Sequence, residues 1–380
     1  MTSRDIAHQR LINQRITGSV FSSPEDIVRW MGCIQAQDFA GGKWAIGIRG
    51  KDISEADIDR DFNAGKILRT HILRPTWHFV SPSDIRWLLR LTAPKIKAFN
   101  KSLHRKLGID DTTLSRSKNI ISKALTGGNQ LTRAQLLSLL KRGRINTDDI
   151  RSGFLLMDAE LDGIICSGAR QGKQSTYALL DERVPISGDT NLGPPGNMAH
   201  DAAIAELTHR YFASRGPATL QDFSWWSGLN LTHARKGIGM NEQRLTYEVF
   251  KGEAYWFPSA IPTRQKPGTA AQEKPGIAAP AMPANPPRNS VYLLPGFDEY
   301  AISYKDRSAL LGQDHRNQSV NGLKPTILIN GQIAGTWKQT LRAGKVLIET
   351  TPGEMPRRMT RDAAAKYARF VNKPLVEELS

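Results

Sequence analysis

Cysteine is nearly absent from this chain of 380 residues, in which only Cys33 and Cys166 occur. Two thiols so far apart match no zinc-binding spacing and cannot build a disulfide framework. Both lie in apolar stretches, so we expect two buried, reduced thiols. A long uncharged apolar segment is also missing, and residues 1–5 are polar, so we expect no membrane span and a cytoplasmic location.

Acidic side chains are scarce relative to basic ones: 36 Asp and Glu stand against 52 Lys and Arg, a formal net charge of +16. An excess of this size favours a polyanionic partner, either nucleic acid or an acidic membrane surface. Because no membrane segment is expected, nucleic acid is the favoured partner. Residues 86–118 are especially rich in Lys and Arg, and they could form a basic stripe that faces DNA or simply a solvated face.

Several catalytic signatures are missing as well. The chain has no His-Glu-x-x-His pair, no Cys and His set at metal-binding spacing, no Gly-x-Ser-x-Gly elbow and no glycine loop for phosphate. These absences count against zinc and serine hydrolases, kinases and dehydrogenases. We therefore expect no metal and no cofactor.

The chain is too long for one hydrophobic core and should contain roughly two to four units. An α+β pattern of helices followed by a β-hairpin recurs three times, and this is the element order of a winged helix. We therefore expect winged-helix segments at 1–106, 107–190 and 191–258. A proline-rich linker or loop at 259–290 and a β-rich C-terminal region with a terminal helix at 291–380 complete the expected organisation.

Helix signals precede an unusual pair of amides near the start of the chain. Ser23-Pro24 predicts the first turn of a helix over 24–35, whose apolar residues share one face. The helix would end at Gln35, with Gln37 just beyond it and before a flexible Gly41-Gly42 segment.

A glutamine amide donates and accepts hydrogen bonds at once, so two such side chains can hold one water molecule in a fixed orientation. This arrangement suits a reaction whose leaving group departs easily, because an amide takes up no proton at neutral pH. On spacing alone, however, paired glutamines near a helix end more often cap backbone groups or face solvent.

Four stretches together resemble one family, although none is distinctive alone. They are Gln35-Ala36-Gln37-Asp38; Arg74-Pro75-Thr76-Trp77-His78; Gly216-Pro217-Ala218-Thr219 followed by Trp225-Trp226-Ser227-Gly228-Leu229; and Leu294-Pro295-Gly296-Phe297-Asp298-Glu299-Tyr300. Nearly the whole chain is similar to the winged-helix DNA glycosylases of the AlkZ/AlkX type.

This resemblance implies three tandem winged helices in a C-shaped arrangement whose basic concave surface binds duplex DNA. It also implies cleavage of the N-glycosidic bond of alkylated purines, above all N7-alkylguanine, and in some members the unhooking of interstrand crosslinks. The family's catalytic motif is Gln, an apolar residue and then Gln or Asp, which assigns catalysis to Gln35 and Gln37. The Gln-apolar-Gln version is associated with the crosslink-unhooking branch, and Ala36 is its smallest apolar choice.

Candidate phosphate contacts are basic residues on the first two hairpins and beside the glutamine pair: Arg69, Arg74, Arg170, Lys173 and Lys43. The competing interpretation is that basic side chains at hairpin tips are simply solvated. The resemblance does not decide between the two interpretations.

Asp38 could orient the glutamines in the pocket, but a cap on the next turn is the favoured interpretation. His78 could reach the same pocket, although a hydrogen-bonded structural histidine is favoured. Asp298-Glu299-Tyr300 suggests paired carboxylates, but adjacent residues on a strand point to opposite faces. We therefore expect a structural role there, or at most one pocket-lining side chain. Trp225 and Trp226 are expected in the core.

The leading hypothesis is a monofunctional DNA glycosylase that hydrolyses the bond to a cationic alkylated purine, without a Lys–sugar intermediate. Its partner is double-stranded DNA with alkylated purines, no obligate protein partner is evident, and it would act in the cytoplasm at the nucleoid. Two alternatives stay open: a non-enzymatic winged-helix DNA-binding transcriptional regulator, and a basic RNA-binding or scaffold protein.

Overall fold

A computed structural model describes residues 1–185, 198–259, 290–311, 323–351 and 357–376. The proline-rich linker predicted at 259–290 lies almost entirely outside these residues. Among the described residues, no helix is both long enough and apolar enough to cross a membrane. Cys33 and Cys166 are buried and form no disulfide, as expected.

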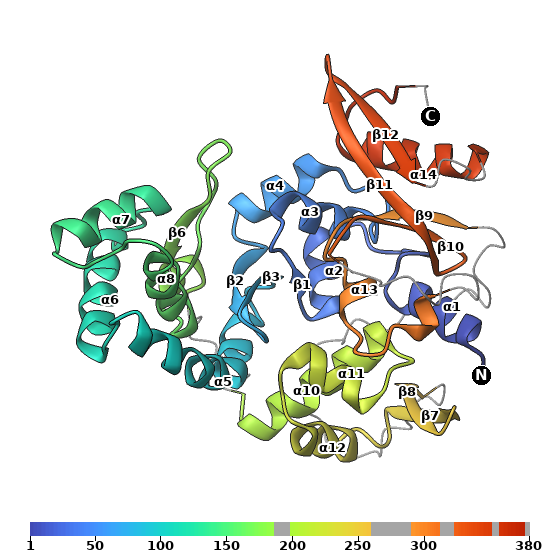
Figure 1. Ribbon diagram of the computed structural model, residues 1–380, viewed down its shortest axis with the longest axis horizontal. Coiled ribbons are helices and arrows are strands. Elements are labelled where there is room, and N and C mark those ends of the chain that lie inside the picture. The colour runs from blue at the N-terminus through green and yellow to red at the C-terminus, as the bar shows by residue number, and fades with distance from the viewer. Residues whose placement is uncertain (186–197, 260–289, 312–322, 352–356, 377–380) are drawn as a thin grey trace. The chain divides into compact units, whose positions relative to one another are not determined.

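The chain forms two compact units that do not follow its linear order. The first unit joins Met1–Ile58 with Ile204–Ser380, and the second contains Asp59–Ala203. In Figure 1 the first unit therefore includes both ends of the colour scale. The predicted segment 1–106 is divided between the two units. Helices and antiparallel strands both occur, in agreement with the predicted α+β class.

The N-terminal part of the first unit contains α1 (Ser3–Asn13), α2 (Pro24–Met31), β1 (Ile34–Gln35) and α3 (Phe39–Gly47), and α4 (Glu55–Asn63) crosses the boundary between the units. Helix α2 begins as predicted, because the Ser23 side chain accepts a hydrogen bond from the backbone of Asp26. It ends at Met31, where Gly32 takes a φ of 72° at the C-cap. Gln35 thus lies on a strand, and the prediction of a helix over 24–35 is wrong at its C-terminal end.

The segment Gly41-Gly42 lies inside α3 and is not a loop, so that prediction is wrong as well. A capped helix begins directly after Gln37, since Asp38 Oδ1 accepts a hydrogen bond of 3.1 Å from the backbone amide of Ala40. A Cβ atom at Gly41 would lie 2.8 Å from Asp38 Oδ2, so the glycine leaves room for this cap. The capping interpretation of Asp38 is therefore confirmed.

The first unit continues with three helices and a hairpin: α10 (His200–Arg215), α11 (Leu220–Ser227), α12 (Leu231–Gly239), β7 (Leu245–Phe250) and β8 (Glu253–Pro258). Helix α11 has the predicted boundaries, with a capping box at Thr219 and Gly228 at its C-cap with a φ of 73°. Trp226 is buried as expected, but Trp225 is 43% exposed. Neighbouring residues on a helix point in different directions, so only one of the two faces the core.

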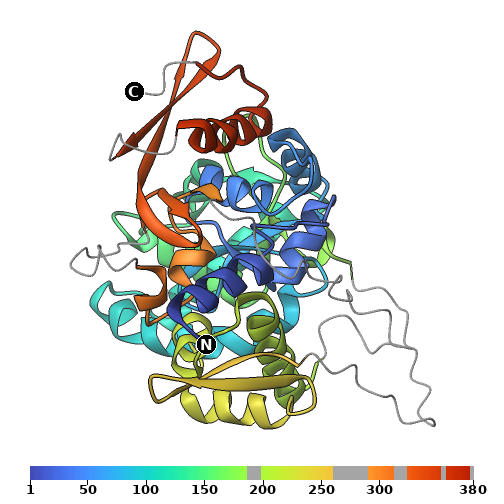
Figure 2. The ribbon, with the colours of Figure 1, turned by 90° about the vertical axis from the view of Figure 1, so that its right-hand side faces the viewer.

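The C-terminal region adds β9 (Val291–Leu294), α13 (Glu299–Ile302), the short 3-10 helix η2 (Ser308–Leu310), β10 (Thr326–Ile329), β11 (Gln332–Arg342), β12 (Lys345–Thr351) and α14 (Arg357–Phe370). The strands form an antiparallel sheet in the order β12-β11-β10-β9, with the predicted Asn330-Gly331 turn between β10 and β11. Helix α14 lies beside this sheet in both views (Figures 1 and 2). Its Tyr367 and Phe370 rings pack on Trp44 of α3, with centroids 5.0 and 4.9 Å away.

The second unit contains β2 (Leu68–Ile72), β3 (Thr76–Val80), α5 (Ile85–Lys106), α6 (Asp111–Leu125), β4 (Leu131–Thr132), α7 (Arg133–Arg142), α8 (Arg151–Leu161), β5 (Ile165–Ser167), β6 (Thr176–Leu179) and α9 (Leu180–Arg183). The capping box predicted at Thr132 is present, with Gln135 as its partner. Strands β4, β6 and β5 form a sheet in that order. Apolar residues of α6, α7 and α8, among them Leu125, Leu136 and Leu155, pack beneath it.

Candidate active site

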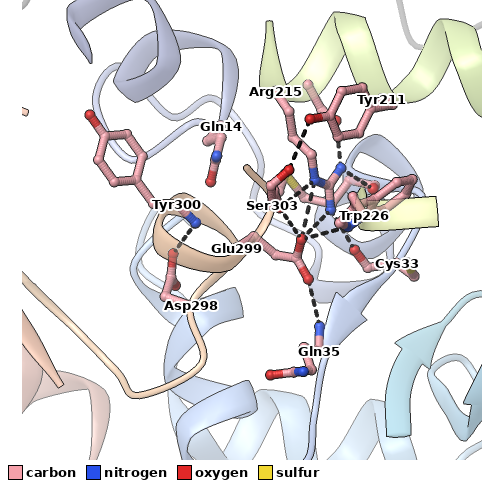
Figure 3. Close-up of polar contacts among 12 residues, drawn as sticks. Gln14, Cys33, Gln35, Tyr211, Arg215, Trp226, Asp298, Glu299, Tyr300 and Ser303 are labelled. Atoms are coloured by element: carbon pink, nitrogen blue, oxygen red, sulfur yellow. Dashed lines mark hydrogen bonds and ion pairs between the residues drawn. The ribbon is translucent and has the colours of Figure 1, made fainter. Parts of the chain in front are cut away.

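Gln35 is held in place through its backbone. It lies on β1 between Ile34 and Ala36, which are both fully buried, and is itself 7% exposed. Its backbone amide donates a hydrogen bond of 2.9 Å to Glu299 Oε1. The side chain of Gln35 points away from the Glu299 carboxylate (Figure 3).

The amide oxygen of Gln35 is buried and has no hydrogen-bond partner among the described residues. Leaving a buried acceptor unpaired costs roughly 1–3 kcal/mol. Gln35 Oε1 is one of sixteen buried side-chain atoms without a partner among the described residues, and a catalytic role is one explanation for such an atom. The Gln35 oxygen thus keeps its capacity to accept a hydrogen bond.

Glu299 is fully buried and uses both carboxylate oxygens. While Oε1 accepts from Gln35, Oε2 accepts from Arg215 Nη2 at 2.8 Å, Trp226 Nε1 at 3.0 Å and Ser303 Oγ at 2.5 Å. Figure 3 shows these donors converging on one side of the carboxylate. Residues from α10, α11 and α13 therefore meet at a single acid that also binds β1.

Arg215 secures the backbone on the other side of this acid. Its Nη1 donates to the carbonyl oxygen of Met31 at 2.7 Å, and its Nη2 donates to that of Cys33 at 2.9 Å. Met31 is the last residue of α2, and Cys33 lies in the turn that connects α2 to β1. The guanidinium also lies over the Trp226 ring, 4.3 Å from its centroid. The turn before Gln35 and the amide of Gln35 are thus tied to the same ion pair.

Asp298 forms a second buried ion pair next to the first. It caps α13 by accepting from the backbone amide of Tyr300 at 2.8 Å, and it accepts from Arg49 Nη1 at 2.8 Å and Nη2 at 2.7 Å. The structural role expected for Asp298-Glu299-Tyr300 is therefore confirmed, but the strand on which that expectation rested is wrong. The segment is the start of a helix, and this lets the two adjacent carboxylates serve two different arginines.

The remaining candidates near Gln35 differ in exposure. Gln37 and Asp38 are exposed. Lys43 is 3% exposed within α3, and its Nζ forms an ion pair of 2.8 Å with Glu55. A lysine that is buried and paired in this way is poorly suited to the phosphate contact predicted for it.

The first hairpin of the second unit contains three candidates. The Arg69 guanidinium lies 4.2 Å from the centroid of the Trp77 ring, and Arg74 is partly buried. His78 is buried, with Nδ1 2.9 Å from the carbonyl oxygen of Thr76, which agrees with the favoured structural interpretation. The same hairpin also contains a buried contact between His71 and Glu160 of α8 that the sequence did not predict.

The second hairpin, between β5 and β6, contains the last two candidates. Arg170 Nη2 donates to the carbonyl oxygen of Lys173 at 2.7 Å, and Arg170 Nη1 lies 3.8 Å from Asp59. Lys173 itself is exposed. Lys173 is therefore the more accessible of the two cations for a phosphate.

Sequence reasoning missed Arg215 and the contact between Glu299 and Gln35. Gln35 and Glu299 are separated by 264 positions, so no local spacing could indicate their contact. Within the described part of the chain, no group of three or more His, Cys, Asp or Glu side chains is arranged to hold a metal ion.

Comparisons with known proteins identify a family and similar proteins. The family model named DNA glycosylase AlkZ-like matches residues 28–370. The interstrand DNA cross-link repair glycosylase of Streptomyces sahachiroi is 24% identical over 348 residues, which cover 88% of this chain and 87% of that protein. The solved structure of Streptomyces sahachiroi DNA glycosylase AlkZ has a similar fold, with a TM-score of 0.75, 22% identity and 99% of each chain covered. Since the family model spans most of its length, the chain belongs to the AlkZ-like family of DNA glycosylases and is an enzyme rather than a non-catalytic regulator.

Proposed function

We propose that this DNA glycosylase hydrolyses the N-glycosidic bond of cationic alkylated purines, of the N7-alkylguanine type, in duplex DNA. The observation that carries the proposal is the Gln35 side chain, whose amide oxygen is buried and lacks a partner among the described residues. Gln37 lies two residues further on and is exposed, so it can supply a second amide. In this proposal both glutamines contact the attacking water.

The chemistry of the leaving group supports two neutral amides as catalysts. Alkylation at N7 makes the purine cationic, and the base departs as a neutral molecule. The enzyme then has to orient water and stabilise an oxocarbenium-like sugar. An amide oxygen accepts from water and points a partial negative charge at the sugar, and neither task requires a strong base. We therefore propose monofunctional hydrolysis that leaves an abasic site.

The substrate range that we propose includes purines held in an interstrand crosslink through N7. Such a crosslink presents the same cationic leaving group, and the Streptomyces sahachiroi relative is named for crosslink repair. The proposed place of action is the nucleoid in the cytoplasm.

We also propose that the segments 1–106, 107–190 and 191–258 are three winged helices that bind duplex DNA in a C-shaped arrangement. In the second segment α6, β4, α7, α8, β5 and β6 follow one another, and the strand order is β4-β6-β5. The third segment repeats this sequence of elements, with Ala218 forming a bridge to Trp256 where a first strand would lie. Both orders support the winged-helix assignment.

In this arrangement the exposed Lys173 contacts a DNA phosphate, with Arg170, Arg69 and Arg74 as further proposed contacts. The net charge of +16 supports a groove that binds phosphates. Lys43 is less suited to a phosphate contact, because it is buried and paired with Glu55.

The test is the double variant Gln35→Ala/Gln37→Ala, assayed for release of N7-methylguanine from alkylated duplex DNA and for crosslink unhooking. Loss of a well-placed polar group beside a developing charge lowers the rate by about 10²–10³, while duplex binding should stay nearly intact. Gln243→Ala removes an exposed amide elsewhere and serves as the matched control. Excision at the wild-type rate by the double variant would refute the assignment, and an equal loss of binding would indicate a DNA-reading role.

A further inference from the structure

The two oxygens of the Glu299 carboxylate accept hydrogen bonds from different donors. Oε2 faces Arg215, Trp226 and Ser303, whereas Oε1 accepts from the backbone amide of Gln35. The first set of contacts holds the acid in place. The second contact holds the backbone of β1, a strand of only two residues, at a fixed distance from this carboxylate.

We propose that Glu299 is a positioning residue for base excision, which fixes the Gln35 amide for the attacking water through the Gln35 backbone. This inference rests on the proposed catalytic role of Gln35. In this role Glu299 acts only through hydrogen bonds and does not touch the substrate.

The geometry of Gln35 explains why such a residue is needed. Because the side-chain oxygen of Gln35 has no partner among the described residues, that atom is not oriented by a hydrogen bond of its own. The position of the β1 backbone and the packing around the buried side chain therefore orient it. The backbone is fixed from both sides, by Glu299 at the Gln35 amide and by Arg215 at the carbonyl of Cys33.

The neighbouring residue offers a matched control. Asp298 is also fully buried in an ion pair with an arginine, Arg49, and the two pairs have similar distances of 2.7 and 2.8 Å. The hydrogen bonds of the Asp298 oxygens run to Arg49 and to the backbone of Tyr300, and not to Gln35. Asp298→Asn therefore disturbs a comparable buried pair without the contact to β1, and asparagine keeps the helix cap.

The variant Glu299→Gln acts selectively on the contact with Gln35. Its amide nitrogen replaces one of the two oxygens, and at the Oε2 position it would face donors from Arg215, Trp226 and Ser303. At the Oε1 position it faces the Gln35 amide rather than those three donors, so this orientation is favoured. The new N–H group then opposes the Gln35 N–H and displaces β1. Glu299→Asp is a second variant, which keeps the charge beside Arg215 but withdraws the carboxylate from Gln35 by one methylene.

The experiment measures single-turnover release of N7-methylguanine, duplex affinity and the backbone amide resonance of Gln35 in the full chain, below the unfolding temperature of each variant. We expect both Glu299 variants to excise about tenfold to a hundredfold more slowly, since small misplacements of a catalytic group have effects of this size. Duplex affinity should stay within about twofold, because the change lies in the transition state. The Gln35 amide resonance should move upfield in both variants as it loses a charged acceptor. Asp298→Asn should change neither the rate nor that resonance.

Two results would overturn the inference. One is a wild-type rate for both Glu299 variants. The other is an equal loss of rate in Asp298→Asn, which would show that the ion pairs matter only for stability. Gln35→Ala separates this question from the proposed function. If it is inactive while the Glu299 variants are fully active, only the positioning role fails, and if it excises normally, the proposed catalytic role fails.

Discussion

Replacing Arg215 with Met should strongly destabilise the first unit. The substitution leaves Glu299 charged and buried without its arginine partner, and the carbonyl oxygens of Met31 and Cys33 lose the donors of Arg215. Removing one partner of a buried ion pair costs about 3–5 kcal/mol. For a unit of this size, each kcal/mol lowers the unfolding temperature by about 2–4 °C, so we expect a fall of about 10 °C.

The assay is urea unfolding of the wild type, Arg215→Met, Glu299→Gln and the double variant, which together form a thermodynamic cycle. If the penalty arises from an unpaired buried charge, the double variant should be more stable than Arg215→Met, because neither charge remains. A double variant that is no more stable than Arg215→Met would refute this reasoning. So would an Arg215→Met variant destabilised by less than about 1 kcal/mol, a cost typical of an exposed pair.

Three further predictions concern the pH dependence of stability, the salt dependence of DNA binding and the chemistry of excision. Burial lowers the pKa of His209 from 6.5 to about 4, so the unfolded chain binds a proton on this residue at a pH where the folded chain does not. Stability should therefore fall between pH 6.5 and 4, and His209→Gln should flatten that part of the curve in urea unfolding. Lys173→Ala should weaken binding to duplexes of every sequence and reduce the slope of log affinity against log salt by roughly one unit, and an unchanged slope would exclude the phosphate contact. Excision should continue in the presence of a chelator and should give no protein–DNA adduct with borohydride; loss of activity or a trapped species would indicate a metal or a nucleophilic lysine.

Elements with local signals could be predicted from the sequence. The capping box at Thr219 and the C-cap at Gly228 define α11, and both depend on residues within one helix. The Asn330-Gly331 turn is equally local, because its two residues adopt positive φ angles of 51° and 81°. In such segments the stabilising contacts lie within a few positions of one another, so the sequence contains the information needed.

The site could be predicted only in part. The apolar face of α2 continues in sequence to Ile34, and periodicity alone could not show that Gly32 ends the helix before Gln35. The role proposed for Glu299 depends on its contacts with Gln35 and Arg215, which lie 264 and 84 positions away. Long-range contacts of this kind leave no trace in spacing or amphipathicity, so the residues that hold the backbone at Gln35 could be recognised only in the folded chain.

The division of the chain has a consequence for its synthesis on the ribosome. The second unit is continuous in sequence, so it can fold as soon as residues 59–203 have emerged. The glutamine motif is made much earlier than Glu299, and its strand has no acceptor for the Gln35 amide until the C-terminal region follows. A nascent or truncated chain therefore contains both glutamines without the contact that fixes them. Excision activity should arise only when synthesis has passed residue 299, and fragments that stop earlier should not release bases from DNA.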